Sequence, residues 1–179
     1  TDVDANSRSH VKIACLKVLR SANPQAAHAG ALVVAKIGAL ELQEKQWPEL
    51  LGQLLKNMTT KDVGNSNIKK TSTLEALGYL CEDLEEEEVD QTETNQILTA
   101  IVDGMREDGA ITVRVAAARA LLSSLVFTRH NFDNETERTM IMQVLCTATK
   151  SPDEQLRIIA FESLARVAAL YYEKLPQYI

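Results

Sequence analysis

Three histidines and three cysteines carry the most reactive side chains of this sequence: His10, His28, His130, Cys15, Cys81 and Cys146. The histidines are far apart in the sequence, and none belongs to a cluster with the spacing of metal ligands. No cysteine has a Cys-x-x-Cys partner or a neighbouring base that would activate it as a nucleophile. We therefore expect surface histidines, reduced cysteines packed in a core, and no metal or other cofactor.

An acidic run at 82–90 offers carboxylates for weak cation binding or for a basic partner. Its four consecutive glutamates, Glu85–Glu88, lack the alternating oxygen ligands of a calcium-binding loop. A solvated linker is the simpler interpretation, since its carboxylates also favour the N-terminus of a following helix. The sequence contains no Gly-x-Gly-x-x-Gly or phosphate-binding loop, no Gly-x-Ser-x-Gly elbow and no His-Glu-x-x-His motif. We find no basis for an enzyme.

Composition narrows the classes of function further. The 179 residues carry a net charge of −6, which argues against a nucleic-acid binder that needs a basic face. No apolar run approaches the ~18–20 residues of a membrane span, and no signal peptide opens the chain, so we expect no membrane insertion. An odd number of widely spaced cysteines is typical of a reducing compartment, the cytoplasm or the nucleus.

An internal repeat predicts the elements that position these residues. The stretch GAITVRVAAARALLSSL at 109–125 places an aliphatic residue, a base, a small residue and a leucine at Val113, Arg114, Ala117 and Leu121. The pattern returns in EQLRIIAFESL (154–164), and more weakly in KKTSTLEALGYL (69–80) and AGALVVAKI (29–37). The steps between copies are roughly 40, 44 and 43 residues, inside the ~40–47 window of HEAT and armadillo helix pairs. Arg114 and Arg157, just inside helix starts, are expected to pair with acids in neighbouring turns.

We therefore predict an all-α fold, an α-solenoid of about four HEAT repeats with eight antiparallel helices in A/B pairs. The repeats are placed at about 4–42, 46–84, 91–128 and 134–173. Few glycines, few prolines and 4% aromatic residues favour helices over sheets, and stacked pairs bury a stripe that no helix buries alone. Because the chain begins with Thr1 and its last predicted helix runs nearly to its end, we expect a fragment of a longer solenoid.

Helix ends carry further signals in the second half of the chain. Residues 129–133 are expected to form a linker between the sixth and seventh helices. Asn134 and Glu137 fit a capping box for the seventh helix. The run Ser151-Pro152-Asp153-Glu154 combines a cap, a first-turn proline and a capping glutamate, so the eighth helix is expected to start there.

Two predicted A helices carry more apolar residues than packing on their own B helices requires. In the helix over 91–106, Ile97, Ile101 and Met105 suffice for that contact, while a second row lies about 100° around the axis. If this helix and the one over 134–150 lie side by side, four side chains rim a shallow apolar groove: Leu98, Val102, Met140 and Ile141. Such a groove suits an aromatic side chain of an extended peptide. The alternative is that these residues only join adjacent repeats.

Six longer strings are more specific than the repeat pattern: QWPELLGQL (46–54), STLEALGYLCEDL (72–84), NQILTAIVDGM (95–105), SSLVFTRHNFDNETER (123–138), IMQVLCTAT (141–149) and LYYEKLPQYI (170–179). In combination they resemble the importin-β (karyopherin-β1) family of nuclear transport receptors over almost the whole chain. A generic HEAT protein would share the arginine and alanine positions of the repeat, but not these strings. The resemblance implies HEAT repeats three to six of the N-terminal half, with A helices on a convex outer face and B helices on a concave inner face.

The resemblance also implies a nuclear import receptor whose A helices bind FxFG-repeat nucleoporins by taking up a phenylalanine between repeats five and six. The matching positions in this sequence are Leu98, Thr99 and Val102 on one helix, and Glu137, Met140 and Ile141 on the next. Relatives often carry an aromatic residue where this chain has Met140, and a methionine can line the same pocket.

Further partners follow from the same resemblance. The inner B helices of the first repeats contact the small GTPase Ran in its GTP form, while importin-α and cargo bind the full-length receptor. The acidic Ran-contacting loop of the family lies in later repeats, so Glu85–Glu88 is not its equivalent. The resemblance implies a location in the cytoplasm and the nucleus, including the nuclear envelope and pore complex.

Two other interpretations are open at this stage. A passive HEAT-repeat scaffold or adaptor subunit, such as a phosphatase regulatory subunit or a coat adaptor, would bind through concave B-helix loops and would not bind FxFG peptides. A helical enzyme fragment would need a polar pocket with a titrating acid or base, and the sequence shows none.

Overall fold

The computed structural model describes residues 5–60, 66–84, 90–106 and 108–175, and within these ranges the chain contains no strand. Nine α-helices are found there: α1 (Ala5–Val18), α2 (Pro24–Gln43), α3 (Leu50–Thr59), α4 (Ser66–Asp83), α5 (Gln91–Gly104), α6 (Ile111–Ser124), α7 (Arg129–Asp133), α8 (Glu135–Ala148) and α9 (Glu154–Tyr171). Two 3-10 turns, Leu125–Phe127 and Tyr172–Lys174, extend α6 and α9. The predicted acidic linker at Glu85–Glu88 lies outside the described residues.

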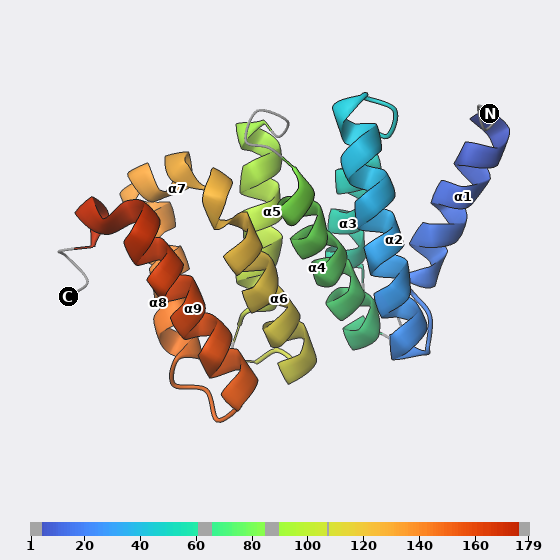
Figure 1. Cartoon of the computed structure of the whole chain (residues 1–179). Coiled ribbons are helices and arrows are strands. Elements are labelled where there is room, and N and C mark those ends of the chain that lie inside the picture. Colours follow the sequence, from blue (N-terminus) through green and yellow to red (C-terminus); the bar gives the residue numbers. More distant parts are fainter. Residues whose placement is uncertain (1–4, 61–65, 85–89, 107, 176–179) are drawn as a thin grey trace.

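The helices stack in two rows, which form an α-solenoid (Figure 1). In the row that we call the B row, α2 lies against α4, α4 against α6 and α6 against α9. In the A row, α3 adjoins α5 and α5 adjoins α8, with α1 at the blue end of the row. Each A-row helix packs on the B-row helix that follows it in the chain. The predicted all-α solenoid is therefore confirmed, while the four repeat boundaries stay a prediction.

One helix, α7, was missed by the sequence analysis. Residues 129–133, expected to form a linker, make a short helix between the two rows. Phe132 of α7 is fully buried, and its ring stacks on Tyr171 of α9 with centroids 4.1 Å apart and an interplanar angle of 7°. Phe132 is the buried apolar contact of α7 with α9, and a single apolar residue carries no periodic signal.

The start of α9 also differs from the prediction. Asp153, not Ser151, is the N-cap, because the Asp153 carboxylate accepts from the backbone N–H of Leu156. The Ser151 carbonyl instead accepts from Arg157 at 2.9 Å. Neither Arg157 nor Arg114 makes the expected ion pair with an acid in the part of the chain that the structure describes. Arg157 also donates to the carbonyl oxygen of Pro152 at 2.9 Å, so it ties the first turn of α9 to the preceding loop.

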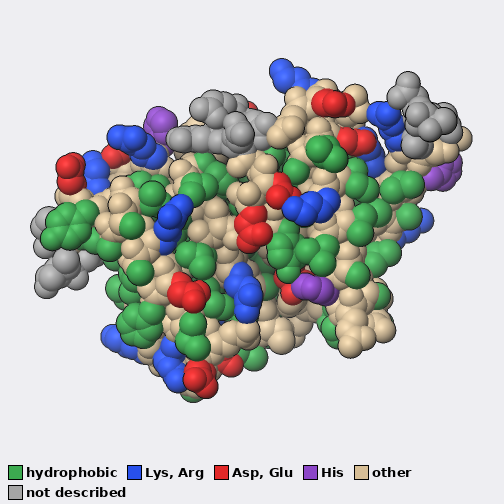
Figure 2. All heavy atoms as spheres, in the orientation of Figure 1, with side chains coloured by type: hydrophobic (Ala, Val, Ile, Leu, Met, Phe, Trp, Pro, Cys, Tyr) green, Lys and Arg blue, Asp and Glu red, His purple; other side chains and the backbone are tan. Residues whose placement is uncertain are grey.

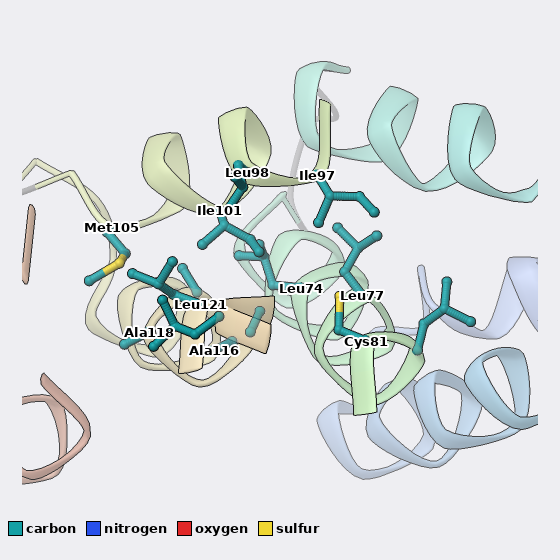
Figure 3. Close-up of a cluster of buried hydrophobic side chains, with 14 of the residues drawn as sticks. Leu74, Leu77, Cys81, Ile97, Leu98, Ile101, Met105, Ala116, Ala118 and Leu121 are labelled. Carbon is teal, nitrogen blue, oxygen red and sulfur yellow. The ribbon is translucent and has the colours of Figure 1, made fainter. Parts of the chain in front are cut away.

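The core at the middle of the solenoid joins α4, α5 and α6 (Figure 3). Five fully buried residues form its centre: Leu74 and Leu77 of α4, Ile97 and Ile101 of α5, and Leu121 of α6. Helices α4 and α6 approach closely because Gly78 has no side chain, and a Cβ there would lie 3.2 Å from the Cα of Ala120. Each large apolar side chain buried in this way contributes about 1.5–3 kcal/mol to stability.

Candidate functional site

The six residues predicted to bind a phenylalanine lie on α5 and α8, two neighbouring helices of the A row. Both helices run in the same direction, from the end that carries α7 toward the opposite end (Figure 1). A peptide that lies across the A row would therefore meet side chains of both helices at the same level.

A buried amide joins the first turns of these two helices. Asn131 of α7 donates through Nδ2 to the side-chain oxygen Oδ1 of Asn95 in α5 at 2.7 Å and to a carboxylate oxygen of Glu137 in α8. Gln91 donates to the side-chain oxygens of Asn95 at 2.8 Å and of Asn131 at 3.2 Å. Asn131 is only 2% exposed, so these bonds satisfy a group that would be costly to bury unpaired. The link fixes the register of α5 against α8.

One helical turn beyond this link, about 3.6 residues onward, lie four of the predicted residues. On α5 these are Leu98 and Thr99, and on α8 they are Met140 and Ile141. Leu98 and Ile141 are only 5% and 3% exposed, so they lie beneath the surface instead of rimming an open slot. Met140 is 52% exposed. The helices therefore present two buried apolar side chains, Leu98 and Ile141, and one exposed methionine that directly precedes Ile141 in α8.

The remaining predicted residues differ from one another in their surroundings. Val102 is half-buried and packs against the core. Glu137 accepts from the Asn134 amide at 2.9 Å and from Asn131, so both of its oxygens are engaged within the protein. Thr99 is exposed and lines a hollow on the other side of α5, toward α3. The residues share one region of the A row, and their role in binding stays a prediction.

Sequence reasoning missed the amides that hold α5 and α8 together. Gln91, Asn95 and Asn131 are polar residues in helices, and a periodicity argument assigns such residues to solvent. The only signal near them was Phe132, an aromatic residue inside the predicted linker. Burial of Phe132 carries its neighbour Asn131 into the interior, where the amide meets α5 and α8.

A hollow of about 1200 Å³ lies on the B row over α4, α6 and α9. Five carboxylates line it: Glu75, Glu82, Asp153, Glu154 and Glu162. Only two lining residues can carry positive charge, Arg119 and His28. Burial, and then the neighbouring carboxylates, raise the pKa of Tyr79 in this hollow. Figure 2 faces the B row and shows charged and hydrophobic side chains interspersed along it. The hollow suits a partner with basic and apolar groups.

The reactive side chains are arranged as follows. All three histidines are exposed, as predicted. Cys81 is buried and Cys15 is half-buried, but Cys146 is exposed on α8, so the prediction of a core position is wrong for Cys146. Over the described residues, no group of three or more His, Cys, Asp or Glu side chains is placed to hold a metal ion. No helix in the same ranges has the length and apolar character that a membrane span needs.

Comparison with known proteins gives a consistent result. The chain is 42% identical over 178 residues to importin subunit beta-1 of Arabidopsis thaliana, covering 99% of this chain and 20% of that protein. It is 41% identical over 173 residues to importin subunit beta-1 of Schizosaccharomyces pombe, covering 96% of this chain and again 20% of the relative. The chain thus spans about a fifth of the length of these relatives. No model of a protein family matches it.

Solved structures of the same kind of protein have the same fold. A crystal structure of importin beta matches 98% of this chain, and 20% of its own, with a TM-score of 0.88 and 40% identity. The Kap95:Nup1 complex matches 99% of this chain, and 21% of its own, with a TM-score of 0.84 and 35% identity. A structure of Kap95p with RanGDP matches 99% of this chain, and 20% of its own, with a TM-score of 0.88 and 34% identity.

Proposed function

Because the chain belongs to the importin-β family, we propose that it forms part of a nuclear import receptor and binds FxFG-repeat nucleoporins between α5 and α8. The observation that carries the proposal is the pairing of these helices, with Leu98 and Ile141 buried and Met140 exposed beside Ile141 in the sequence. The similarity to Kap95 in complex with Nup1 supports a nucleoporin as the partner.

In this proposal a phenylalanine ring lies against the Met140 thioether and the Val102 side chain. A methionine sulfur near a ring contributes about 0.3–1.5 kcal/mol, and burying an aromatic side chain contributes about 1.5–3 kcal/mol before ordering costs. Glu137 positions α8 instead of contacting the peptide, because its oxygens are already engaged. Binding of one phenylalanine is therefore weak and rapidly reversed, and many repeats on one nucleoporin restore avidity.

Titration of a fluorescent FxFG peptide, followed by anisotropy, tests the proposal. We expect Val102→Asp and Met140→Asp to lower affinity by about tenfold or more, because each places a carboxylate where the ring would be buried. Met140 is exposed, so its substitution leaves folding intact, which far-UV circular dichroism checks. Val33→Asp, on an exposed valine of the B row, is the matched control. Undiminished binding by both A-row variants would reject the site.

A second candidate function concerns the B row. The structure of Kap95p with RanGDP and the acidic hollow over α4, α6 and α9 favour a contribution to a Ran-binding surface. We propose that the B row supplies an edge of the surface that binds Ran in its GTP form. Biolayer interferometry with Ran loaded with a non-hydrolysable GTP analogue, or with GDP, tests this, and equal absence of binding by both forms would contradict it.

The wider role of the chain follows from the same proposal. As a segment of an import receptor it would act as a binding module, not as an enzyme, in the cytoplasm, the nucleus and the nuclear pore. Importin-α and cargo would engage the full-length receptor. A passive HEAT scaffold or adaptor remains the rival function, and it predicts no binding of FxFG peptides by the A row.

A further inference from the structure

The A row has a second groove, one helix earlier than the pair discussed above. A hollow of about 1040 Å³ runs along α3 and α5 and continues to the start of α6. One stripe of each A-row helix faces it: Gly52, Leu55, Lys56 and Thr59 of α3, and Thr92, Gln96, Thr99 and Asp103 of α5. These facing side chains are mostly small or polar, so the two helices do not close over the space between them.

Apolar groups line the deeper part of this α3–α5 groove. Leu55 and Met58 of α3 are half-buried and present part of their surface to it. Ala100, Gly104 and Val113 are buried and line it from α5 and α6. A hollow with an apolar interior and a polar rim is the common form of a site for one anchoring side chain.

Gly52 has no packing reason to be a glycine. A Cβ built there would have no neighbouring atom within 4 Å, whereas one at Gly78 would lie 3.2 Å from the Cα of Ala120. Glycine destabilises a helix relative to alanine. At Gly52 this loss of helix stability is not required by packing, because a Cβ would meet no other atom there. The effect of Gly52 is to leave the α3 wall of the groove flat, with backbone that a planar group can approach.

The rim of the groove carries polar side chains. Neither Lys56 nor Lys70 forms an ion pair with a residue of the described ranges, and both line the groove. A lysine ammonium near a ring face is attracted to it, which favours an aromatic occupant over an aliphatic one. Gln96 is exposed on the opposite wall and is available to the backbone of an extended peptide.

We propose that the α3–α5 groove is a second phenylalanine-binding groove for the same FxFG repeats, an inference that rests on the function proposed above. Helix α5 is shared, and Thr99 lines the α3–α5 groove while Leu98 and Val102 serve the α5–α8 site. Neighbouring helices lie about 8–10 Å apart, so repeats of one nucleoporin reach both grooves. Once one repeat is bound in one groove, the effective concentration of the next repeat at the other groove is raised. The nucleoporin then binds more tightly without any new contact in either groove.

The methionines supply one reporter for each groove. Of the four methionines, Met58 lines the α3–α5 groove, Met140 is exposed beside the α5–α8 site, and Met105 and Met142 are buried. An FxFG peptide is titrated into protein labelled with ¹³C at the methionine methyl groups, and a peptide with both phenylalanines replaced by serine is the control. We expect ring-current shifts at Met58 and Met140 and none at the two buried methionines.

Gly52→Leu fills the groove from an open position, and leucine favours the helix more than glycine does. We expect it to abolish the Met58 shift and to leave the Met140 shift, while Val102→Asp does the reverse. Gly52→Ala and Gln53→Leu are the controls, because alanine leaves the groove open and Gln53 is exposed outside it. Both controls should retain the Met58 shift.

The outcomes separate the two proposals. A shift at Met140 alone, lost in Val102→Asp, overturns the second groove and leaves the proposed function standing. A shift at Met58 alone, lost in Gly52→Leu, supports the second groove and rejects the α5–α8 site. A Met58 shift that persists in Gly52→Leu, or no shift at either methionine, overturns the second groove.

Discussion

The Asn131 amide donates to the side-chain oxygen of Asn95 at 2.7 Å and thereby ties the short helix α7 to α5. The second N–H of the same amide is donated to Glu137 of α8. The spacing of the two helices at the proposed site therefore depends on a residue that belongs to neither of them. Because Asn131 is buried and its donors are both used, no solvent molecule is needed to complete this link.

We predict that Asn131→Ala lowers the free energy of unfolding by about 1–3 kcal/mol. The substitution removes the buried amide that donates to the exposed Asn95 and to the half-buried Glu137. Affinity for an FxFG peptide should fall as well, because the register of α5 and α8 is loosened. Urea denaturation and peptide titration measure the two effects. His130→Ala, an exposed neighbour on the same short helix, should change neither, and an unchanged stability of Asn131→Ala would contradict the proposed link.

Tyr171 of α9 also supports α7, and the contributions of its ring and of its hydroxyl can be measured separately. Its ring stacks on Phe132, and its hydroxyl donates to the Leu125 carbonyl at 2.6 Å. Tyr171→Phe should cost about 0.5–1.5 kcal/mol for each hydrogen bond of the hydroxyl, which also lies 3.3 Å from the Thr128 hydroxyl. Tyr171→Ala should cost about 3–5 kcal/mol, since the ring contact is removed as well. Thermal unfolding measures both, with Tyr172→Phe as a control at an exposed tyrosine, and equal losses in the two Tyr171 variants would refute this division.

The fold was predictable because its signals are periodic. Repeat copies such as those at Val113 and Leu156 recur at helix-pair spacing, and stacked pairs can bury such stripes only as a solenoid. Helix α7 carried no such signal, since two isolated residues, Phe132 and Asn131, fix it through tertiary contacts. The cap of α9 was misplaced by two residues because Ser151 and Asp153 are both good capping residues, and only the path of the loop selects one.

The candidate site was predictable at the level of helices but not of side chains. The apolar periodicity and the resemblance to the importin-β family both indicated α5 and α8, and these two helices are in contact in the structure. The sequence left open whether Leu98 and Ile141 rim a groove or only join adjacent repeats, because the same apolar row serves either role depending on how closely the helices approach. The hollow between α3 and α5 was missed because Gly52 and small polar residues give no apolar pattern.

The cysteines should differ sharply in their reaction with iodoacetamide. Burial, and secondarily the Glu82 carboxylate, raise the pKa of Cys81 from 9.0 to about 12. At pH 8 the reactive thiolate of Cys81 is then on the order of one part in ten thousand, even before access is considered. We expect rapid alkylation of the exposed Cys146 and none of Cys81 while the protein is folded. Peptide mass mapping at several times measures this. Alkylation of Cys81 at the rate of Cys146 would contradict the buried position.

Two glycines on neighbouring helices should respond to alanine with opposite signs. At Gly52 of α3 a Cβ meets no atom within 4 Å, so Gly52→Ala adds helix propensity and should stabilise by about 0.5–1 kcal/mol. At Gly78 of α4 the same Cβ lies 3.2 Å from the Cα and 3.4 Å from the Cβ of Ala120. These contacts are with the α6 backbone and its first side-chain atom, which cannot rotate away. Gly78→Ala must therefore separate α4 from α6, at a cost of about 1–3 kcal/mol that exceeds the gain in propensity. Urea denaturation of the two variants and of the unaltered chain measures the change in the free energy of unfolding for each substitution. Stabilisation by Gly78→Ala would show that the B row is less tightly packed than described.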